Sequence, residues 1–287
     1  QSRVSAPLTR QQAYSLADAS SEIEDMALAV SAYEDEKGEW MFEALCEGEP
    51  DLSAFDAIAR NVLGGKVDFS ADRIDPDTDW IARSLQGLPP VEAGGFFIHA
   101  SHNADRIPAR TIPIRIEAAQ AFGTGHHETT MGCLRAIDEI VAAQQPQNCL
   151  DVGTGTGVLA IALAKRLQRH IMASDIDPVA VETTLDNARL NNVEKHITCV
   201  QAAGLDHETI RARSPYDLIV ANILAAPLAE LAPDMSRAAA KGSTLVLSGL
   251  LNTQAADIQQ TYARHGFALE KRLPINDWAT LVLRKTE

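Results

Sequence analysis

The sequence predicts an α/β protein in which a parallel sheet, with helices on both faces, follows a smaller α+β unit. From about residue 111 onward, short apolar runs alternate with helical patterns, which favours a parallel sheet. Residues 1–74 instead hold two adjacent strand patterns between two helical ones. Pro and Gly punctuate residues 75–110, as is typical of a connector, in which we expect a short helix at 80–85 and a short strand at 95–100. A length of 287 residues allows two domains of ordinary size.

The first unit contains four expected strands and two expected helices. The strands cover residues 4–8, 26–33, 39–46 and 67–74, and the helices cover 9–20 and 51–63. Gly64 and Gly65 close the second helix. The resulting order, β-α-β-β-α-β, is that of a ferredoxin-like fold. We place the end of this unit at residue 72 and assign residues 73–110 to a linker.

The second unit, residues 111–287, alternates strands and helices. Strands are expected at 149–152, 170–174, 197–201, 218–221 and 244–248, with closing strands near 267–271 and 279–284. Such a Rossmann-like sheet has its ligand crevice at the carboxyl ends of the parallel strands. Residues that directly follow these strands are therefore the candidate functional residues.

Composition and charge exclude several classes of protein. The net charge is −14, and residues 1–110 hold 20 acidic and 9 basic residues, so direct binding of nucleic acid is disfavoured. The excess of acidic residues either keeps the protein soluble or forms a docking surface for a basic partner. No apolar stretch approaches the roughly 20 residues that a membrane span requires. Four widely spaced cysteines without a C-x-x-C pair predict neither a metal site nor disulfides, and favour the reducing cytoplasm.

The strongest local signal is the segment Asp151-Val-Gly153-Thr-Gly155-Thr-Gly157, which follows a strand and opens a helix. Glycines allow the backbone to approach a ligand closely. Gly155-x-Gly157-x-x-Ala160 also satisfies the dinucleotide pattern G-x-G-x-x-[GA]. At this point an NAD-dependent dehydrogenase remains an alternative.

Two polar residues follow neighbouring strands. Asp175 ends the second strand, where a carboxylate can accept hydrogen bonds from both hydroxyls of a ribose. This holds whether the cofactor is a dinucleotide or a single nucleoside. Asp177 better suits a helix cap, because Pro178 follows as the first helical residue. Asn222 ends the fourth strand, where amine methyltransferases carry Asn or Asp; the alternative is an ordinary strand-to-helix turn.

A fourth segment, Ala121-Phe-Gly-Thr-Gly-His-His-Glu-Thr-Thr130, precedes the helix that leads to the first strand. It is rich in glycine and polar residues, and we expect it to lie over the edge of the cofactor. Its two histidines are adjacent, and adjacent side chains seldom point the same way. We therefore expect no metal here.

Four segments together resemble the PrmA family, the bacterial methyltransferases of ribosomal protein L11. AFGTGHHETT is similar to the family's A-F-G-T-G-T-H-P-T-T, and DVGTGTGVLAIALAK to its glycine motif. DIDPVAVETTLDNARLN and ANILAAPLAELAP resemble its next two motifs, in the same order. Together they decide against the dehydrogenase. The chain departs from the signature at His126, where Thr is usual, and at Glu128, where Pro is usual.

The resemblance implies a class I S-adenosyl-L-methionine-dependent methyltransferase whose catalytic domain is residues 111–287. It implies that the enzyme methylates lysine side chains and the α-amino group of ribosomal protein L11, which residues 1–72 would recognise. Asn222, at the position that faces both cofactor and acceptor in amine methyltransferases, would be the catalytic residue. No side chain stands out as an obligate base. The implied cofactor-binding residues are Thr130, Gly153, Asp175 and Asn222, together with Phe122, Gly123, Thr124 and Gly155.

Other readings of the chain remain. A sister methyltransferase acting on another protein would keep every cofactor motif and differ in residues 1–110. A non-catalytic ribosome- or protein-binding module would bind the partner without methyl transfer. We expect a cytoplasmic monomer with no membrane association.

Overall fold

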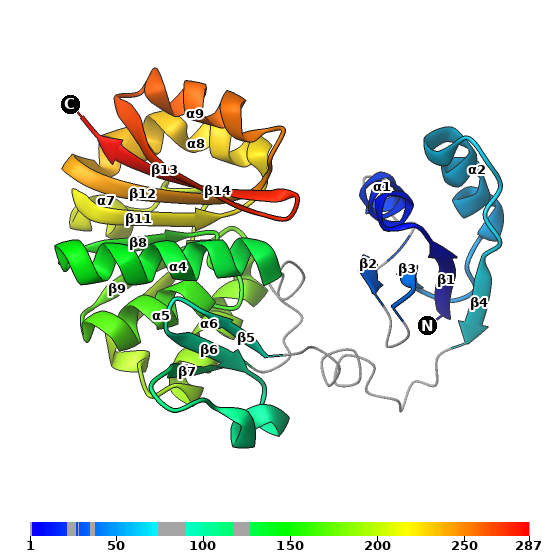
Figure 1. Ribbon diagram of the computed structural model, residues 1–287, viewed down its shortest axis with the longest axis horizontal. Helices are drawn as coiled ribbons and strands as arrows, with labels where there is room; N and C mark the ends of the chain where they lie inside the picture. Colours follow the sequence, from blue (N-terminus) through cyan, green and yellow to red (C-terminus); the bar gives the residue numbers. More distant parts are fainter. Residues whose placement is uncertain are drawn as a thin grey trace. The chain divides into compact units, whose positions relative to one another are not determined.

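A computed structural model describes residues 2–21, 27, 29–34, 38–73, 90–116 and 127–286. The chain divides into two compact units, Gln1–Trp80 and Ile81–Glu287. Figure 1 draws both units, coloured along the sequence. Each unit has its own core, and the two are described separately.

The first unit is a four-stranded antiparallel sheet with two helices. Its elements are β1 (Ser2–Leu8), α1 (Arg10–Ser21), β2 (Ala29–Glu34), β3 (Trp40–Cys46), α2 (Leu52–Leu63) and β4 (Ser70–Arg73). The strand order is β2-β3-β1-β4, with every neighbouring pair antiparallel. This order confirms the predicted ferredoxin-like fold.

Local sequence explains where α2 begins and ends. Asp51 caps the helix, because its Oδ1 accepts a hydrogen bond of 2.9 Å from the Ser53 N–H. Gly64 ends it in the left-handed conformation, at φ 70°, and donates its N–H to Arg60 O. The helix buries Phe55 against Phe42 of β3, with ring centroids 6.0 Å apart. These contacts form the core of the small unit.

The second unit is built on a seven-stranded sheet. Its strands are β8 (Cys149–Val152), β9 (Ile171–Asp175), β10 (Ile197–Gln201), β11 (Tyr216–Asn222), β12 (Ala239–Leu251), β13 (Phe267–Ile275) and β14 (Trp278–Lys285). Their spatial order is β10-β9-β8-β11-β12-β14-β13. The strands from β10 to β12 pair in parallel, and β14 is antiparallel to both of its neighbours.

This topology confirms the predicted α/β class and locates the crevice. The chain runs outward from β8 to β10 on one side and then returns to place β11 on the other side. Such a reversal of strand order is a switch point, and ligands bind there at the carboxyl ends of the strands. The dinucleotide-binding order 3-2-1-4-5-6 lacks the antiparallel strand that is inserted here as β14.

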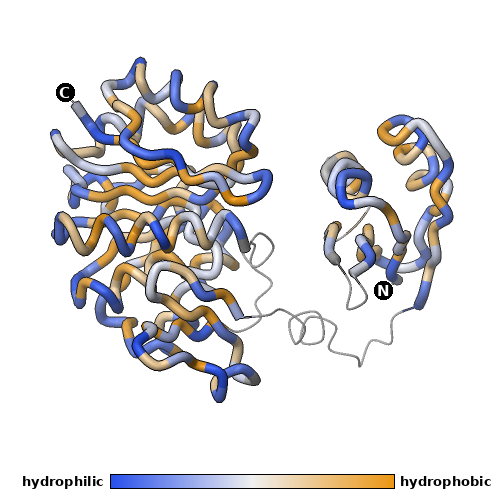
Figure 2. The backbone as a smooth tube through the Cα atoms, in the orientation of Figure 1, coloured by the Kyte–Doolittle hydropathy of each residue, from blue (hydrophilic) through white to orange (hydrophobic). Residues whose placement is uncertain are grey.

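Helices cover both faces of this sheet, as Figure 1 shows. They are α4 (His127–Gln144), α5 (Val158–Leu167), α6 (Pro178–Leu190), α7 (Glu208–Arg213), α8 (Ala225–Ala238) and α9 (Ala255–Ala263), with short 3-10 turns at Ser101–Arg106 and Glu194–His196. Successive strand side chains point to opposite faces. Cys149 and Val220 therefore pack into the core with α4 and α5, whereas Leu150 and Ile219 pack with α8 and α9. Figure 2 shows the hydrophobic residues gathered along these strands.

Part of the expected linker belongs to the second unit. Strands β5 (Val91–Ala93), β6 (Phe96–His99) and β7 (Ile112–Arg115) form a three-stranded sheet, and Phe96 is fully buried in the same core as α4. Residues 91–110, which we assigned to the linker 73–110, therefore lie in the second unit. Their glycines mark a turn instead: a Cβ on Gly94 would lie 2.3 Å from Leu134 O. The helix expected at 80–85 lies outside the described residues.

No helix within the described ranges is long and apolar enough to cross a membrane.

Candidate active site

The glycine loop after β8 is held on two sides. Gly153, Gly155 and Gly157 all have positive φ, at 69°, 56° and 82°, a conformation that favours glycine. The Gly153 N–H donates to Ser174 O at the end of β9, at 2.8 Å. On the other side, a Cβ on Gly153 would lie 2.3 Å from Ile223 Cγ2. Neighbours on both sides therefore fix the position of the loop.

Asp175 ends β9 with its carboxylate directed by backbone donors. Oδ2 accepts from the Gly155 N–H at 2.8 Å, and Oδ1 accepts from the Asp177 N–H at 3.1 Å. Each oxygen keeps a second lone pair, so the partly exposed carboxylate can still accept the hydroxyls of a ligand. Asp177 caps α6 by accepting from the Val179 N–H at 2.8 Å, as its position before Pro178 predicted.

Asn222 ends β11, on the far side of β8 from Asp175. It lies opposite Ser248 in the pairing of β11 with β12. Within the part of the chain that the structure describes, no residue hydrogen-bonds to its side chain, which is partly exposed. A primary amide offers both a carbonyl acceptor and two N–H donors. Asn222 can therefore bind an amine acceptor and a cofactor.

Thr130 lies in the first turn of α4 and is 8% exposed. The neighbouring Thr129 O accepts from Ser248 Oγ at 3.4 Å, and Ser248 Oγ lies 2.9 Å from Thr280 Oγ1. The start of α4 is thus attached to the end of β12, beside Asn222. The structure brings Thr130, Gly153, Asp175 and Asn222 to one edge of the sheet, whereas residues 122–124 lie outside the described residues.

Glu128, a departure from the family signature, has a defined contact. Its Oε1 accepts from Asn276 Nδ2 at 3.0 Å, at the turn between β13 and β14. Asn276 O in turn accepts from Asn252 Nδ2, just after β12, at 2.8 Å. The carboxylate therefore links the start of α4 to the hairpin and replaces the rigid turn residue that proline would supply.

Asp151 is a buried carboxyl beneath the glycine loop that sequence reasoning did not single out. It is 1% exposed, and its Oδ2 accepts from Thr154 Oγ1 at 2.8 Å and from the Ala160 N–H at 3.0 Å. Among the residues that the structure describes, none hydrogen-bonds to its Oδ1. Desolvation raises the pKa of Asp151 to about 7, although its two hydrogen bonds act in the opposite direction. The sequence signal was available: a carboxylate inside an apolar strand.

Two buried cysteine thiols, Cys133 and Cys199, feel the charge of Asp151. Burial raises the pKa of both Cys133 and Cys199 to about 12, and the charge of Asp151 acts in the same direction. In the described segments, no group of three or more His, Cys, Asp or Glu side chains could hold a metal ion. All four cysteines are free.

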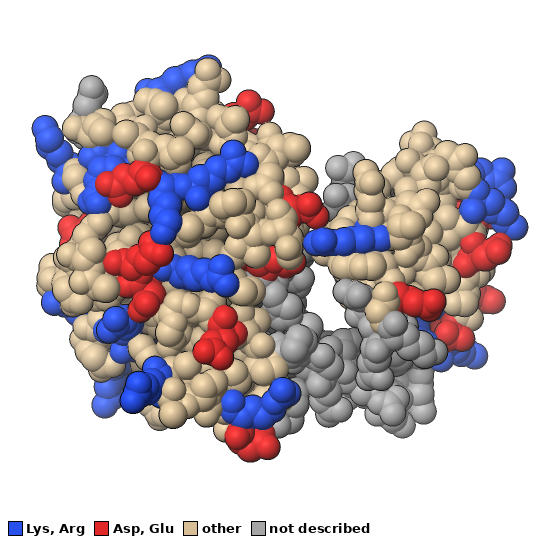
Figure 3. Space-filling model, in the orientation of Figure 1, with Lys and Arg blue, Asp and Glu red and all other residues tan. Residues whose placement is uncertain are grey.

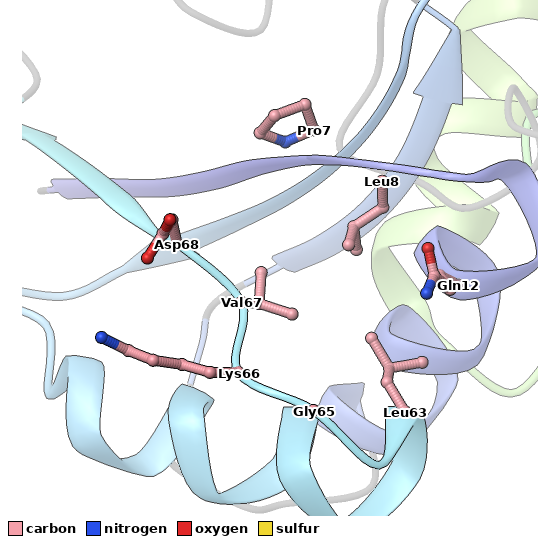
Figure 4. A pocket seen from close by; sticks show the side chains of 8 residues that line it. All are labelled: Pro7, Leu8, Gln12, Leu63, Gly65, Lys66, Val67 and Asp68. Carbon is pink, nitrogen blue, oxygen red and sulfur yellow. The ribbon is translucent and has the colours of Figure 1, made fainter.

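The first unit carries a cavity of its own, of about 290 Å³ (Figure 4). Leu8, Leu63 and Val67 give it an apolar lining, and Lys66 and Asp68 add charges of opposite sign. All of its lining residues belong to the first unit.

The residues present fit a nucleoside cofactor. The glycine loop carries no side chains at Gly153, Gly155 and Gly157, so its backbone can approach a ligand closely, and the partly exposed Asp175 carboxylate presents acceptors for a ribose. With Asn222 on the opposite side of β8, on a seven-stranded sheet that contains one antiparallel strand, this arrangement is that of an S-adenosyl-L-methionine-dependent methyltransferase.

Comparison with known proteins identifies the family. The profile of the ribosomal protein L11 methyltransferase (PrmA) family matches residues 2–286. The chain is 43% identical over 261 residues to the ribosomal protein L11 methyltransferase of Bradyrhizobium diazoefficiens, covering 90% of this chain and 88% of that one. It is 42% identical to the enzyme of the same name from Brucella suis, covering 91% of each. The chain belongs to the PrmA family.

A solved structure agrees with this assignment. The ribosomal protein L11 methylase of Lactobacillus delbrueckii subsp. bulgaricus superposes with a TM-score of 0.61 at 28% identity, covering 69% of this chain and 99% of that one. The protein is therefore a protein methyltransferase that uses S-adenosyl-L-methionine.

Proposed function

We propose that the enzyme methylates lysine side chains and the α-amino group of ribosomal protein L11. The observation that carries this proposal is that the family match extends over both units, from residue 2 to residue 286. A match confined to the large sheet would support the cofactor alone. A match that includes the small unit also supports the protein substrate that gives the relatives their name.

The cofactor would be held along the carboxyl edge of the sheet. Gly153 and Gly155 carry no side chain that would keep the cofactor from the backbone, and Asp175 offers carboxylate oxygens to the ribose hydroxyls. Thr130 and Asn222 would complete the contacts from α4 and β11. We also assign Phe122, Gly123 and Thr124 to this site, from their place in the segment that precedes α4.

The chemistry requires alignment more than acid–base catalysis. When bound, the cofactor supplies an electrophilic methyl carbon, and its sulfur keeps the electron pair of the broken C–S bond. A lysine ammonium, with an ordinary pKa of about 10.4, must first lose a proton to solvent. Burial of that group next to a positive charge lowers its pKa. The Asn222 carbonyl then accepts an amine N–H and directs the nitrogen lone pair, and such alignment contributes several kcal/mol.

The small unit would recognise the substrate. Residues 1–80, the first unit, hold 18 acidic and 6 basic residues, whereas ribosomal proteins are usually basic. Complementary charge accelerates encounter and orients the partners. Figure 3 shows acidic and basic side chains interspersed on the visible face of the second unit, which does not favour a docking surface of one sign there. We place this reaction in the cytoplasm and expect the enzyme to act as a monomer.

Mass spectrometry of purified L11 tests the proposal. Incubation with the enzyme and S-adenosyl-L-methionine should add methyl groups at lysines and at the α-amino group. The same incubation with Asp175→Ala at a low cofactor concentration is the matched control and should add far fewer. Methylation of a different ribosomal protein, with L11 unchanged, would indicate a sister enzyme and refute the assigned substrate.

A further inference from the structure

Two large hydrophobic side chains stand out by their exposure. Ile176 is 69% exposed and Leu224 is 64% exposed, whereas the other exposed large hydrophobic residues in the described ranges reach at most 43%. Single exposed apolar residues are common on protein surfaces. These two, however, follow β9 and β11, next to Asp175 and Asn222. Both therefore border the crevice.

Leu224 is also an unfavourable residue for its place in α8. It is the N-cap, with φ −60° and ψ 156°, and its side chain makes no capping hydrogen bond. The first turn of α8 contains no acidic residue. Ser, Thr, Asp and Asn are strongly preferred at an N-cap, and leucine is among the poorest choices. The same chain caps α2 with Asp51 and α6 with Asp177.

Leucine at this position thus leaves α8 uncapped and exposes apolar surface as well. Local rules are broken in this way mainly where function requires it. The requirement cannot come from packing of the core, because most of the side chain lies in solvent.

The backbone before Leu224 is fixed. Ile223 lies against two glycines: a Cβ on Gly153 would meet its side chain at 2.3 Å, and a Cβ on Gly249 would meet its carbonyl oxygen at 2.2 Å. The turn from Asn222 to Leu224 is therefore clamped between the ends of β8 and β12. Leu224 follows β11, and Asp175, the candidate ribose-binding residue, ends β9. The strand β8 lies between these two strands, so Leu224 and Asp175 are on opposite sides of β8.

We propose that Leu224 contacts the aliphatic chain of the acceptor lysine and is a specificity-determining residue of the enzyme. This inference rests on the proposed function, in which lysine is the acceptor and Asn222 directs its nitrogen. A lysine side chain is a flexible four-carbon stem that ends in a polar group. Such stems lie along apolar surface while the polar end contacts polar groups. Leu224 is complementary to the carbon stem of the lysine, and the Asn222 amide is complementary to its nitrogen.

The test is Leu224→Ser, which exchanges the apolar surface for a favourable cap. The Tm of the second unit should rise by about 2–4 °C. The kcat/KM for methylation of L11 should fall by about tenfold or more, mainly through KM, because the contact is already made in the bound substrate. The Kd for S-adenosylhomocysteine, measured by calorimetry, should stay within about twofold of the wild-type value. A merely structural residue would not raise stability and lower efficiency together.

Two variants complete the design. Leu224→Met keeps the apolar chain and should retain wild-type kcat/KM within about twofold. Leu190→Ser changes a leucine that is 40% exposed at the end of α6 and should leave methylation unchanged.

The outcomes separate this inference from the proposed function. Wild-type kcat/KM in Leu224→Ser would overturn the role of Leu224 alone. A lower Tm together with lower activity would make the residue structural, and an equally large loss of cofactor affinity would move its contact to the cofactor. Failure of the wild-type enzyme to methylate L11 would instead refute the assigned substrate.

Discussion

Replacement of Asp151 by Asn should remove a pH-dependent penalty from the second unit. The carboxyl is 1% exposed, and its pKa is raised from 3.8 to about 7 in the folded protein. The folded state therefore retains a proton that the unfolded state releases between about pH 4 and pH 7, so wild-type stability falls as pH rises through this range. A difference of about three pKa units corresponds to about 4 kcal/mol at pH 8.

Asparagine stays neutral and keeps an oxygen that can accept from Thr154 Oγ1 and the Ala160 N–H. Its amino group would take the place of Oδ1, which has no partner, at a cost of about 1–3 kcal/mol. At pH 8 the variant should therefore be more stable than wild type by roughly 1–3 kcal/mol, and at pH 4 it should be less stable.

Urea unfolding at several pH values measures this difference. Trp278 fluorescence reports on the second unit when Trp40 and Trp80 are replaced by Phe in both proteins. The quantity of interest is the free energy of unfolding of Asp151→Asn minus that of the wild type, because other titrating groups then cancel. If that difference does not change between pH 4 and pH 8, Asp151 is ionised in the folded protein at low pH and the reasoning fails.

Three further predictions concern the cofactor and the substrate. Asp175→Ala should weaken S-adenosyl-L-methionine binding roughly ten- to a hundredfold, since hydrogen bonds to a charged group contribute about 1.5–3 kcal/mol; unchanged affinity by calorimetry in a folded variant would contradict the ribose assignment. Asn222→Ala should lower kcat more than about tenfold while the fold survives, and wild-type turnover would reduce Asn222 to a turn residue. Removal of residues 1–72 should leave cofactor affinity nearly intact and abolish methylation of L11. If the shortened enzyme methylates L11 at the full-length rate, the acidic residues only keep the protein soluble.

The cofactor edge could be predicted because its residues follow strands directly. Gly153, Asp175 and Asn222 each come at the end of an apolar run, and a parallel sheet brings all such ends together. That rule needs no knowledge of long-range contacts. The order of elements in both units could be predicted from the alternation of strand and helix patterns.

Features that depend on distant partners could not be predicted. The contact of Glu128 with Asn276 joins residues 148 positions apart, and nothing in either local sequence indicates the other. The glycines near Gly94 looked like a linker because turn residues are the same in a connector and in a small sheet. The burial of Asp151 Oδ1 without a hydrogen-bond partner among the described residues depends on tertiary packing, which the local sequence does not show.

The position of Ile223 between Gly153 and Gly249 has a consequence for how this enzyme can change. Ile223 lies against the glycine loop through its side chain and against the end of β12 through its backbone. The two glycines, 96 positions apart in the numbering of the chain, therefore act as one constraint on one turn. Substitutions at the two positions should not be additive, because either one displaces the same residue. Substitutions that adapt the enzyme to a new acceptor should therefore occur at Leu224, which is exposed, and not at Gly153, Ile223 or Gly249.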